Sequence, residues 1–156
     1  GNIATSSVQR EPELFRSFAM KGAEIMLRTA SGGFSGVDVQ ACAMYNGFYT
    51  TMCNNAISPG NPNFFEDPGA SSGGSMILGP RGEELAVARE QETAISAPIP
   101  LAQYRERHRQ PFVHKALYMP VLERYQNAYA PNLFSEYQPT DLYDAKVYLK
   151  DKSIWK

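Results

Sequence analysis

Five side chains of this sequence could take part in hydrolytic chemistry, and they belong to Cys42, Cys53, His108, His114 and Glu13. A thiol beside a base is a nucleophile, and a carboxylate can act as a general acid or base. Both cysteines lie within apolar segments, which is typical of small buried side chains. The histidines lie among charged or C-terminal residues, which favours surface or interface roles, and Glu13 lies at a helix start, where a carboxylate stabilises the helix dipole. None of the five is therefore predicted to be catalytic.

The spacing of these side chains also bears on metals and cofactors. No Cys-x-x-Cys or Cys/His spacing is present, so neither a zinc site nor a disulfide framework is predicted. No motif for an organic cofactor is found. Free cysteines fit a reducing compartment, and we expect a cytoplasmic protein.

A helix followed by a strand, over residues 12–28, is expected to position the candidate site. Leu14, Phe15 and Phe18 recur at helical spacing, and Gly22 ends the pattern. The apolar run that follows, at 25–27, predicts a strand covered on both faces. Polar residues come directly after that strand, where open α/β sheets usually bind ligands. We therefore expect some of these residues to line a pocket: Thr29, Ala30 and Ser31.

Residues 1–11 are predicted to form a loop that leads to the first helix. A second helix and strand repeat the helix–strand arrangement. One face of the helix is marked by apolar side chains: Val37, Ala41, Met44, Tyr45 and Phe48. The strand at 50–56 ends in Asn54 and Asn55, which we expect to satisfy backbone groups. Two helix–strand units in succession predict an α/β fold.

The next segments are predicted to be partly antiparallel. Residues 58–73 form a long loop, 75–87 form a hairpin, and 92–99 form a further strand with its proline near the end. The helix predicted at 101–110 carries Arg105, Arg107 and Arg109 on a solvated face or an oligomer contact.

The tail carries six of the nine tyrosines: Tyr118, Tyr125, Tyr129, Tyr137, Tyr143 and Tyr148. Aromatic enrichment on a segment interrupted by prolines is typical of interfaces. We expect this tail to wrap a neighbouring subunit.

Charge and length exclude several classes of partner. The 156 residues include 15 Lys and Arg against 16 Asp and Glu, so nothing indicates binding to nucleic acid. No apolar run approaches the length of a membrane span. We expect a soluble chain without a membrane partner.

Several motifs resemble the carbon-nitrogen hydrolase (nitrilase) superfamily, in particular its aliphatic amidase and formamidase branch. They include AMKGAEIMLRTA at 19–30 and GGSMILGPRGE at 73–83, and the remaining matches lie at 12–13, 40–56 and 97–101, with Arg105. The match runs in order over residues 1–115. We predict two parts: residues 1–115 as the C-terminal half of a nitrilase-like domain, and 116–156 as an extended arm for subunit association.

The resemblance implies an αββα sandwich and a Glu-Lys-Cys site whose Cys thiolate attacks an amide or nitrile carbon. The family's Glu and Lys belong to its N-terminal half, and its nucleophile lies at a strand-to-helix elbow just before the segment that Gly1-Asn2 resembles. No catalytic residue is therefore assigned to this chain. Asn2 is expected to line the pocket, because residues after the nucleophile shape the oxyanion region.

Because the chain begins with Gly rather than Met, we interpret it as a processed, tagged or partial polypeptide. We expect it to hydrolyse a small amide only together with an N-terminal half, which is cleaved from it, separately encoded or absent from this sequence. A homo-oligomer is also expected, through the C-terminal arm. The alternatives are a non-catalytic nitrilase-like assembly module and, within the hydrolases, a nitrilase.

Overall fold

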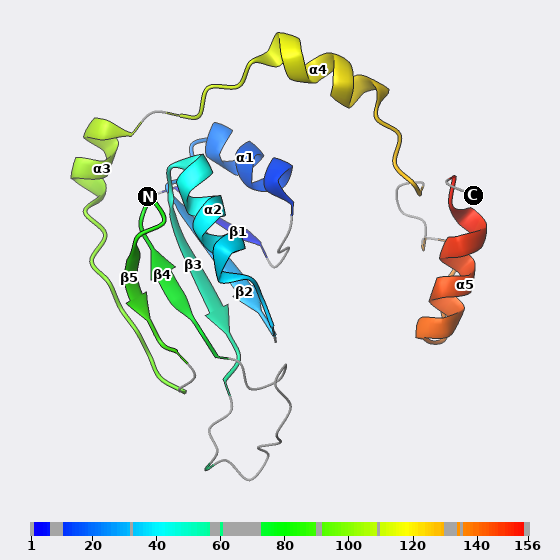
Figure 1. The fold of residues 1–156 in the computed structure, drawn as a ribbon, viewed down its shortest axis with the longest axis horizontal. Helices are drawn as coiled ribbons and strands as arrows, with labels where there is room; N and C mark the ends of the chain where they lie inside the picture. Colours follow the sequence, from blue (N-terminus) through cyan, green and yellow to red (C-terminus); the bar gives the residue numbers. More distant parts are fainter. Residues whose placement is uncertain are drawn as a thin grey trace. The chain divides into compact units, whose positions relative to one another are not determined.

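A five-stranded mixed sheet in the order β1-β2-β3-β4-β5 organises the first part of the chain (Figure 1). The computed structural model describes residues 2–6, 11–31, 33–56, 60, 73–89, 92–108, 110–129, 134 and 136–154, with Ser6 by its backbone alone. The chain divides into two units, Gly1–Phe112 and Val113–Lys156. Of the predicted 58–73 loop, all but residues 60 and 73 lies outside the described residues, as does Arg109.

The sheet is parallel on one side and antiparallel on the other. Its parallel strands are β1 (Ile3–Ser6), β2 (Ile25–Ala30) and β3 (Tyr49–Asn54). Its antiparallel hairpin consists of β4 (Met76–Leu78) and β5 (Glu84–Val87), and β4 pairs with β3. The strands predicted after each helix and the hairpin are thereby confirmed.

Helices α1 (Pro12–Met20) and α2 (Gly36–Asn46) cover one face of this sheet (Figure 1). From α1, Phe15 and Ala19 pack with Met26 of β2 in one apolar cluster. A second cluster joins α2 to β3 and β4. Its buried members are Val39, Ala43, Met52 and Leu78. Helix α2 begins at Ser35, whose Oγ accepts a hydrogen bond from the Asp38 amide at 3.3 Å, and ends at Gly47 in a left-handed conformation.

The buried face of α2 differs from the predicted one. Small residues such as Ala43 let the helix approach the sheet closely, and they form the buried face together with Val39. Three of the residues predicted to be buried are instead exposed, by 74%, 52% and 66% respectively: Val37, Met44 and Tyr45. Of the other two residues of the predicted face, Ala41 is half-buried and Phe48, which follows the helix, is fully buried.

The opposite face of the sheet is open in the first unit. Side chains alternate along β2, so Met26 and Arg28 point toward the helices and are buried, whereas Leu27 and Thr29 are exposed on the other face. Leu27 is 37% exposed. The prediction that this strand is covered on both faces is therefore wrong for the described chain.

Two further predictions about strands are wrong. Residues 3–6 form β1 rather than part of a loop, because the ladder with β2 stabilises a segment whose own sequence has no clear period. Residues 92–99 belong to no strand ladder among the described residues. The helix predicted after them is present as α3 (Leu101–Arg107).

The second unit contains α4 (Lys115–Arg124) and α5 (Leu142–Lys152), so the arm predicted to be extended is partly helical. Neither helix has a buried residue. Local contacts hold the start of α5: the Asp141 side chain caps it, and the Tyr137 hydroxyl donates to Asp144 at 2.7 Å. Tyr137 also stacks on Tyr148, with ring centroids 4.5 Å apart. The proposed association of this unit with another subunit stays a prediction.

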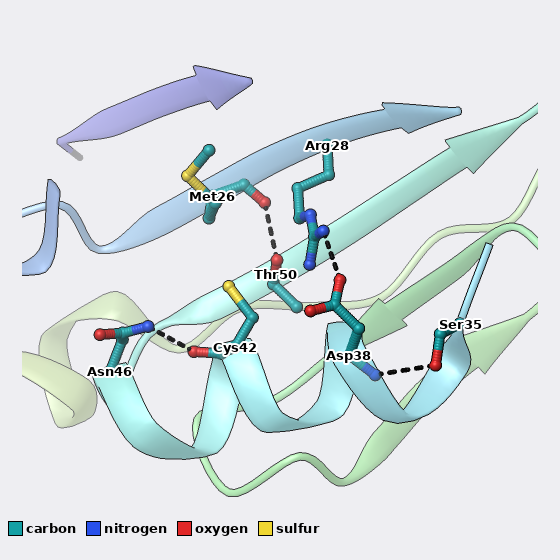
Figure 2. A network of polar contacts seen from close by, with 7 residues as sticks. All are labelled: Met26, Arg28, Ser35, Asp38, Cys42, Asn46 and Thr50. Atoms are coloured by element: carbon teal, nitrogen blue, oxygen red, sulfur yellow. Dashed lines mark hydrogen bonds and ion pairs between the residues drawn. The ribbon is translucent and has the colours of Figure 1, made fainter. Parts of the chain in front are cut away.

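An ion pair between a buried arginine and a partly exposed aspartate joins the sheet to α2. Figure 2 shows Arg28 of β2 reaching Asp38 in the first turn of the helix, with an N–O distance of 2.6 Å. The Arg28 side chain is 1% exposed, and its guanidinium lies 4.4 Å from the centre of the Phe15 ring. Nearby, the Thr50 hydroxyl donates to the Met26 carbonyl at 3.2 Å. This polar layer fixes how the helix sits on the strands.

Replacing Asp38 by Ala should lower the free energy of unfolding by about 3 kcal/mol, because breaking a buried pair leaves a desolvated charge behind. Urea denaturation measures the effect. The neighbouring Val37→Ala is the control, since its exposed side chain should change stability by no more than about 0.5 kcal/mol. Equal stability of Asp38→Ala and the parent would contradict the assigned role of the pair.

Candidate functional site at the carboxyl edge of the sheet

The residues predicted to line a pocket at the carboxyl end of β2 diverge in the structure. Thr29 and Ser31 are exposed, whereas Ala30 is half-buried and packs against the α2 cluster. Thr29 is aligned with Cys53 on β3, and Ala30 with Asn54. The Thr29 side chain thus lies on the open face and that of Ala30 on the helix face. Their role in binding stays a prediction.

Asn54, at the end of β3, has the structural role that the sequence predicts. Its side chain donates to the Gly73 carbonyl at 2.6 Å, and its backbone amide donates to the Ser75 hydroxyl at 2.9 Å. These bonds fix the chain where it enters β4. Asn54 is therefore engaged in holding this edge of the sheet.

Asn2 lies at the opposite edge from Thr29. Its carbonyl accepts a hydrogen bond from the Glu24 amide at 2.8 Å, just before β2 begins. Because β1 and β2 are parallel, the length of β2 separates Asn2 from the residues that follow this strand. The structure therefore does not bring the four predicted pocket residues together.

A salt bridge between Glu24 and Arg105 dominates that amino edge. The Arg105 guanidinium donates to both carboxylate oxygens, at 2.5 and 2.9 Å, and the Asn2 amide donates to Oε2 at 2.7 Å. The Arg105 hydrogen bonds, followed by the Asn2 amide, lower the Glu24 pKa to about 2. Arg105 was predicted to lie on a solvated face or an oligomer contact; its side chain is indeed 54% exposed, and it also ties α3 to the start of β2.

The two thiols have different surroundings. Cys42 is buried in α2, and this burial raises its pKa to about 11, although the nearby Arg28 guanidinium lowers it in part. Cys53 is exposed, so the prediction that both cysteines are buried is wrong for Cys53. It alternates with Met52 along β3, which places it on the open face of the sheet.

His108 contributes to an aromatic cluster that fixes α3. Its ring stacks on that of Tyr104, with centroids 4.6 Å apart, and the Tyr104 hydroxyl donates to the Gly47 carbonyl at 2.8 Å. Tyr104 also contacts Tyr49 at the beginning of β3. This cluster attaches α3 to the amino edge of the sheet, so His108 packs against its own chain. Its predicted surface or interface role stays a prediction.

Among the described residues, no group of three His, Cys, Asp or Glu side chains could hold a metal ion. No helix in the described part of the chain is long and apolar enough to cross a membrane. The carboxyl edge exposes the side chains of Thr29 and Ser31, and their binding role stays a prediction.

The family model described as Carbon-nitrogen hydrolase matches residues 9–109. The chain belongs to this family. Comparison with curated proteins gave no match. The family match covers α1, both strands that flank α2, the hairpin and α3, which are the elements that position the two edges of the sheet.

Solved structures of the nitrilase superfamily have the same fold. An amidase from Nesterenkonia AN1 aligns with a TM-score of 0.55 and 21% identity, over 76% of this chain and 43% of its own. A carbon-nitrogen hydrolase from Helicobacter pylori G27 aligns with a TM-score of 0.58 and 24% identity, over 80% of this chain and 49% of its own. The predicted α/β fold of the nitrilase type is confirmed, and the chain spans less than half the length of these structures.

Arg28 and Glu24 were not singled out from the sequence. Each is a charged residue within or next to an apolar strand, with a partner of opposite charge elsewhere in the sequence. A search for charged residues inside apolar runs could have found them both. It could not have identified Arg105, which lies 81 residues from Glu24 in the sequence.

Alkylation should distinguish the two thiols of the native chain. With iodoacetamide at about pH 8, we expect Cys53 to be modified and Cys42 only after denaturation, because the Cys42 thiol is buried and remains protonated. Peptide mass mapping measures both sites, and Cys53→Ser is the control that should abolish native labelling. Rapid native labelling of Cys42 would contradict its placement.

The Glu24–Arg105 pair should make the stability of the chain depend on pH in the acid range. Since the folded-state pKa of Glu24 is about 2 and its ordinary value is 4.5, the contribution is present above about pH 4.5 and is lost as the pH falls toward 2. Glu24→Gln should therefore flatten the loss of unfolding free energy between these pH values, and Arg105→Gln should flatten it as well. Urea titrations at several pH values measure the slope, and an unchanged slope in both variants would exclude the pair as its source.

Proposed function

We propose that this chain is part of an amidohydrolase that cleaves the C–N bond of a small carboxamide and releases ammonia or an amine. The family match over residues 9–109 carries this proposal. The Nesterenkonia amidase supports it, since one structure of that enzyme contains butyramide and another shows the acetamide moiety of fluoroacetamide on the active-site cysteine. Nitriles are the alternative substrates within the same class.

The proposed reaction uses a Glu-Lys-Cys triad located outside this chain. The Cys thiolate forms a bond to the amide carbon, and a Lys stabilises the negative charge that develops on the oxygen. The C–N bond then breaks as the Glu donates a proton to the leaving nitrogen. Water hydrolyses the resulting thioester, which returns the thiol and releases a carboxylic acid. Cys42 takes no part, since burial keeps it protonated.

The second half of the sandwich is proposed to cover the open face of the sheet. Leu27, Thr29 and Cys53 lie on this face, and two sheets that pack face to face enclose such side chains between them. The solved relatives are long enough to contain such a second half, because this chain spans only 43% and 49% of their length. That half is either joined to this chain or a separate polypeptide, and we place the assembly in the cytoplasm.

The second unit is proposed to join copies of the enzyme. Its α4 exposes apolar side chains, including Leu117, Val121 and Leu122, each by more than half of its surface. Its α5 exposes Tyr143 and Val147 one turn apart. Apolar helix faces of this kind are typical of protein interfaces. We therefore propose a homo-oligomer in which this unit contacts a neighbouring subunit.

A non-catalytic assembly module is the second candidate function. The observation that favours it is the segment between β1 and α1, which is a strand-to-helix connection within this chain. The resemblance associates such a connection with the nucleophile, yet no cysteine precedes Cys42 in the sequence. If this connection corresponds to the family's nucleophile elbow, the assembled protein has no thiol there and binds without hydrolysing.

Treatment of the complete protein with fluoroacetamide separates the two functions. We expect the acetamide adduct on a cysteine outside this chain, together with loss of amide hydrolysis, because only an activated thiolate displaces the fluoride. Peptide mass mapping locates the adduct and an ammonia assay follows hydrolysis.

Cys53→Ser is the matched control for that experiment. This variant should keep full hydrolysis while losing any adventitious label on its exposed thiol. A protein that neither hydrolyses amides nor forms an adduct would favour the assembly module. An adduct on Cys42 that abolishes hydrolysis would contradict the location of the triad.

A further inference from the structure

Residues 92–99 keep the pattern of a strand although they pair with none of the described strands. Ile95, Ala97 and Ile99 are half-buried, whereas the residues between them are exposed. An alternation of period two is the signature of an extended strand with one side against the protein. Ala97 and Ile99 also precede prolines, which biases both toward extended backbone.

The backbone of this segment lacks the partners that a strand requires. Within the described residues, no backbone hydrogen bond involves residues 92–98, and β5 pairs only with β4. Figure 1 draws the segment as an irregular trace between β5 and α3. The backbone amides and carbonyls of residues 92–98, which pair with none of the described backbone, form an edge that another strand can extend.

The described elements on either side of the segment are fixed by the fold. Before it, the amide of buried Ala88 donates to the Ser75 carbonyl at 2.8 Å. After it, α3 is held by the salt bridge between Arg105 and Glu24 and by the buried Tyr104. A segment between fixed elements loses less conformational freedom when a partner strand pairs with it.

The two edges of the segment differ in their hydrogen-bonding groups. Successive residues of a strand direct their amides to opposite edges, so Thr93, Ile95 and Ala97 share one edge. The other edge includes Pro98, which has no amide hydrogen to donate. The uninterrupted row of donors therefore lies on the edge of Thr93, Ile95 and Ala97.

We propose that residues 93–97 are a docking strand, whose edge at Thr93, Ile95 and Ala97 pairs with a β-strand of the second half of the sandwich. This inference rests on the second half required by the proposed function. The solved relatives support that occupant, because more than half of their length lies outside the part that this chain matches. The pairing joins the two halves through backbone hydrogen bonds, in addition to the contact between sheet faces.

Amide hydrogen exchange tests the docking strand residue by residue, by comparing the isolated 156-residue chain with the complete protein purified from its source. Exchange at Thr93, Ile95 and Ala97 should slow about 100-fold in the complete protein, because ladder hydrogen bonds open rarely. The amides of Ala94 and Ser96 should change much less. Equal exchange at Thr93, Ile95 and Ala97 in both samples would overturn the proposal.

Two proline variants provide a matched pair at exposed neighbouring positions. Thr93→Pro removes a donor from the pairing edge, and Ala94→Pro removes one from the other edge. In the complete protein, Thr93→Pro should speed exchange at Ile95 about tenfold, corresponding to one lost ladder bond, while Ala94→Pro leaves it within about twofold. The opposite order would overturn the assignment of the edge.

Hydrolysis of amides by the same preparations keeps the two proposals distinguishable. An active protein with unprotected residues 93–97 overturns the docking strand alone. An inactive protein with protected residues supports the docking strand and counts against the amidohydrolase. Protection in a particle that contains only copies of this chain would overturn the second half as the partner.

Discussion

The parallel strands β1, β2 and β3 require cover on both faces, and this constraint governs the rest of the structure. Helices α1 and α2 bury one face through Phe15 and Val39, and the Arg28–Asp38 pair fixes the second helix in place. The other face exposes Leu27 and Thr29. The first unit is thus one sheet covered by one helical layer, and the chain spans less than half the length of each solved relative.

The chemistry of the chain follows from the same arrangement. Its buried thiol, Cys42, belongs to the layer between helix and sheet, and burial keeps it protonated. Its exposed thiol, Cys53, lies on the face that a second sheet would cover. The strongest polar interactions, at Arg28 and Glu24, connect elements of the fold to one another. In the described residues, these charged side chains therefore hold the framework of the fold together.

The sequence predicted those parts of the fold that rest on local patterns. The spacing of Phe15 and Phe18 indicated α1, and the motif around Gly82 indicated the hairpin, because helix periodicity and turn geometry are encoded by neighbouring residues. The strand β1 was missed, since its stability depends on pairing with β2. Long-range pairs such as Glu24 with Arg105 were also missed, because no local pattern records them.

Candidate site residues were predicted less well than the elements that carry them. The expectation that Asn2 and Thr29 share a pocket assumed a loop before α1, whereas β1 places Asn2 at the amino edge and β2 places Thr29 at the carboxyl edge. For residues 92–99 the outcome is the reverse. The side chains alternate as predicted, but the segment pairs with none of the described strands. In both cases the missing information is the strand partner.

Native mass spectrometry of the protein purified from its source tests most directly whether this chain is one half of a covered sandwich. The account predicts that each copy carries additional polypeptide, joined or separate, with a mass comparable to its own 17.3 kDa. A stable, folded particle made only of copies of this 156-residue chain, with the Leu27 face still open to solvent, would contradict it.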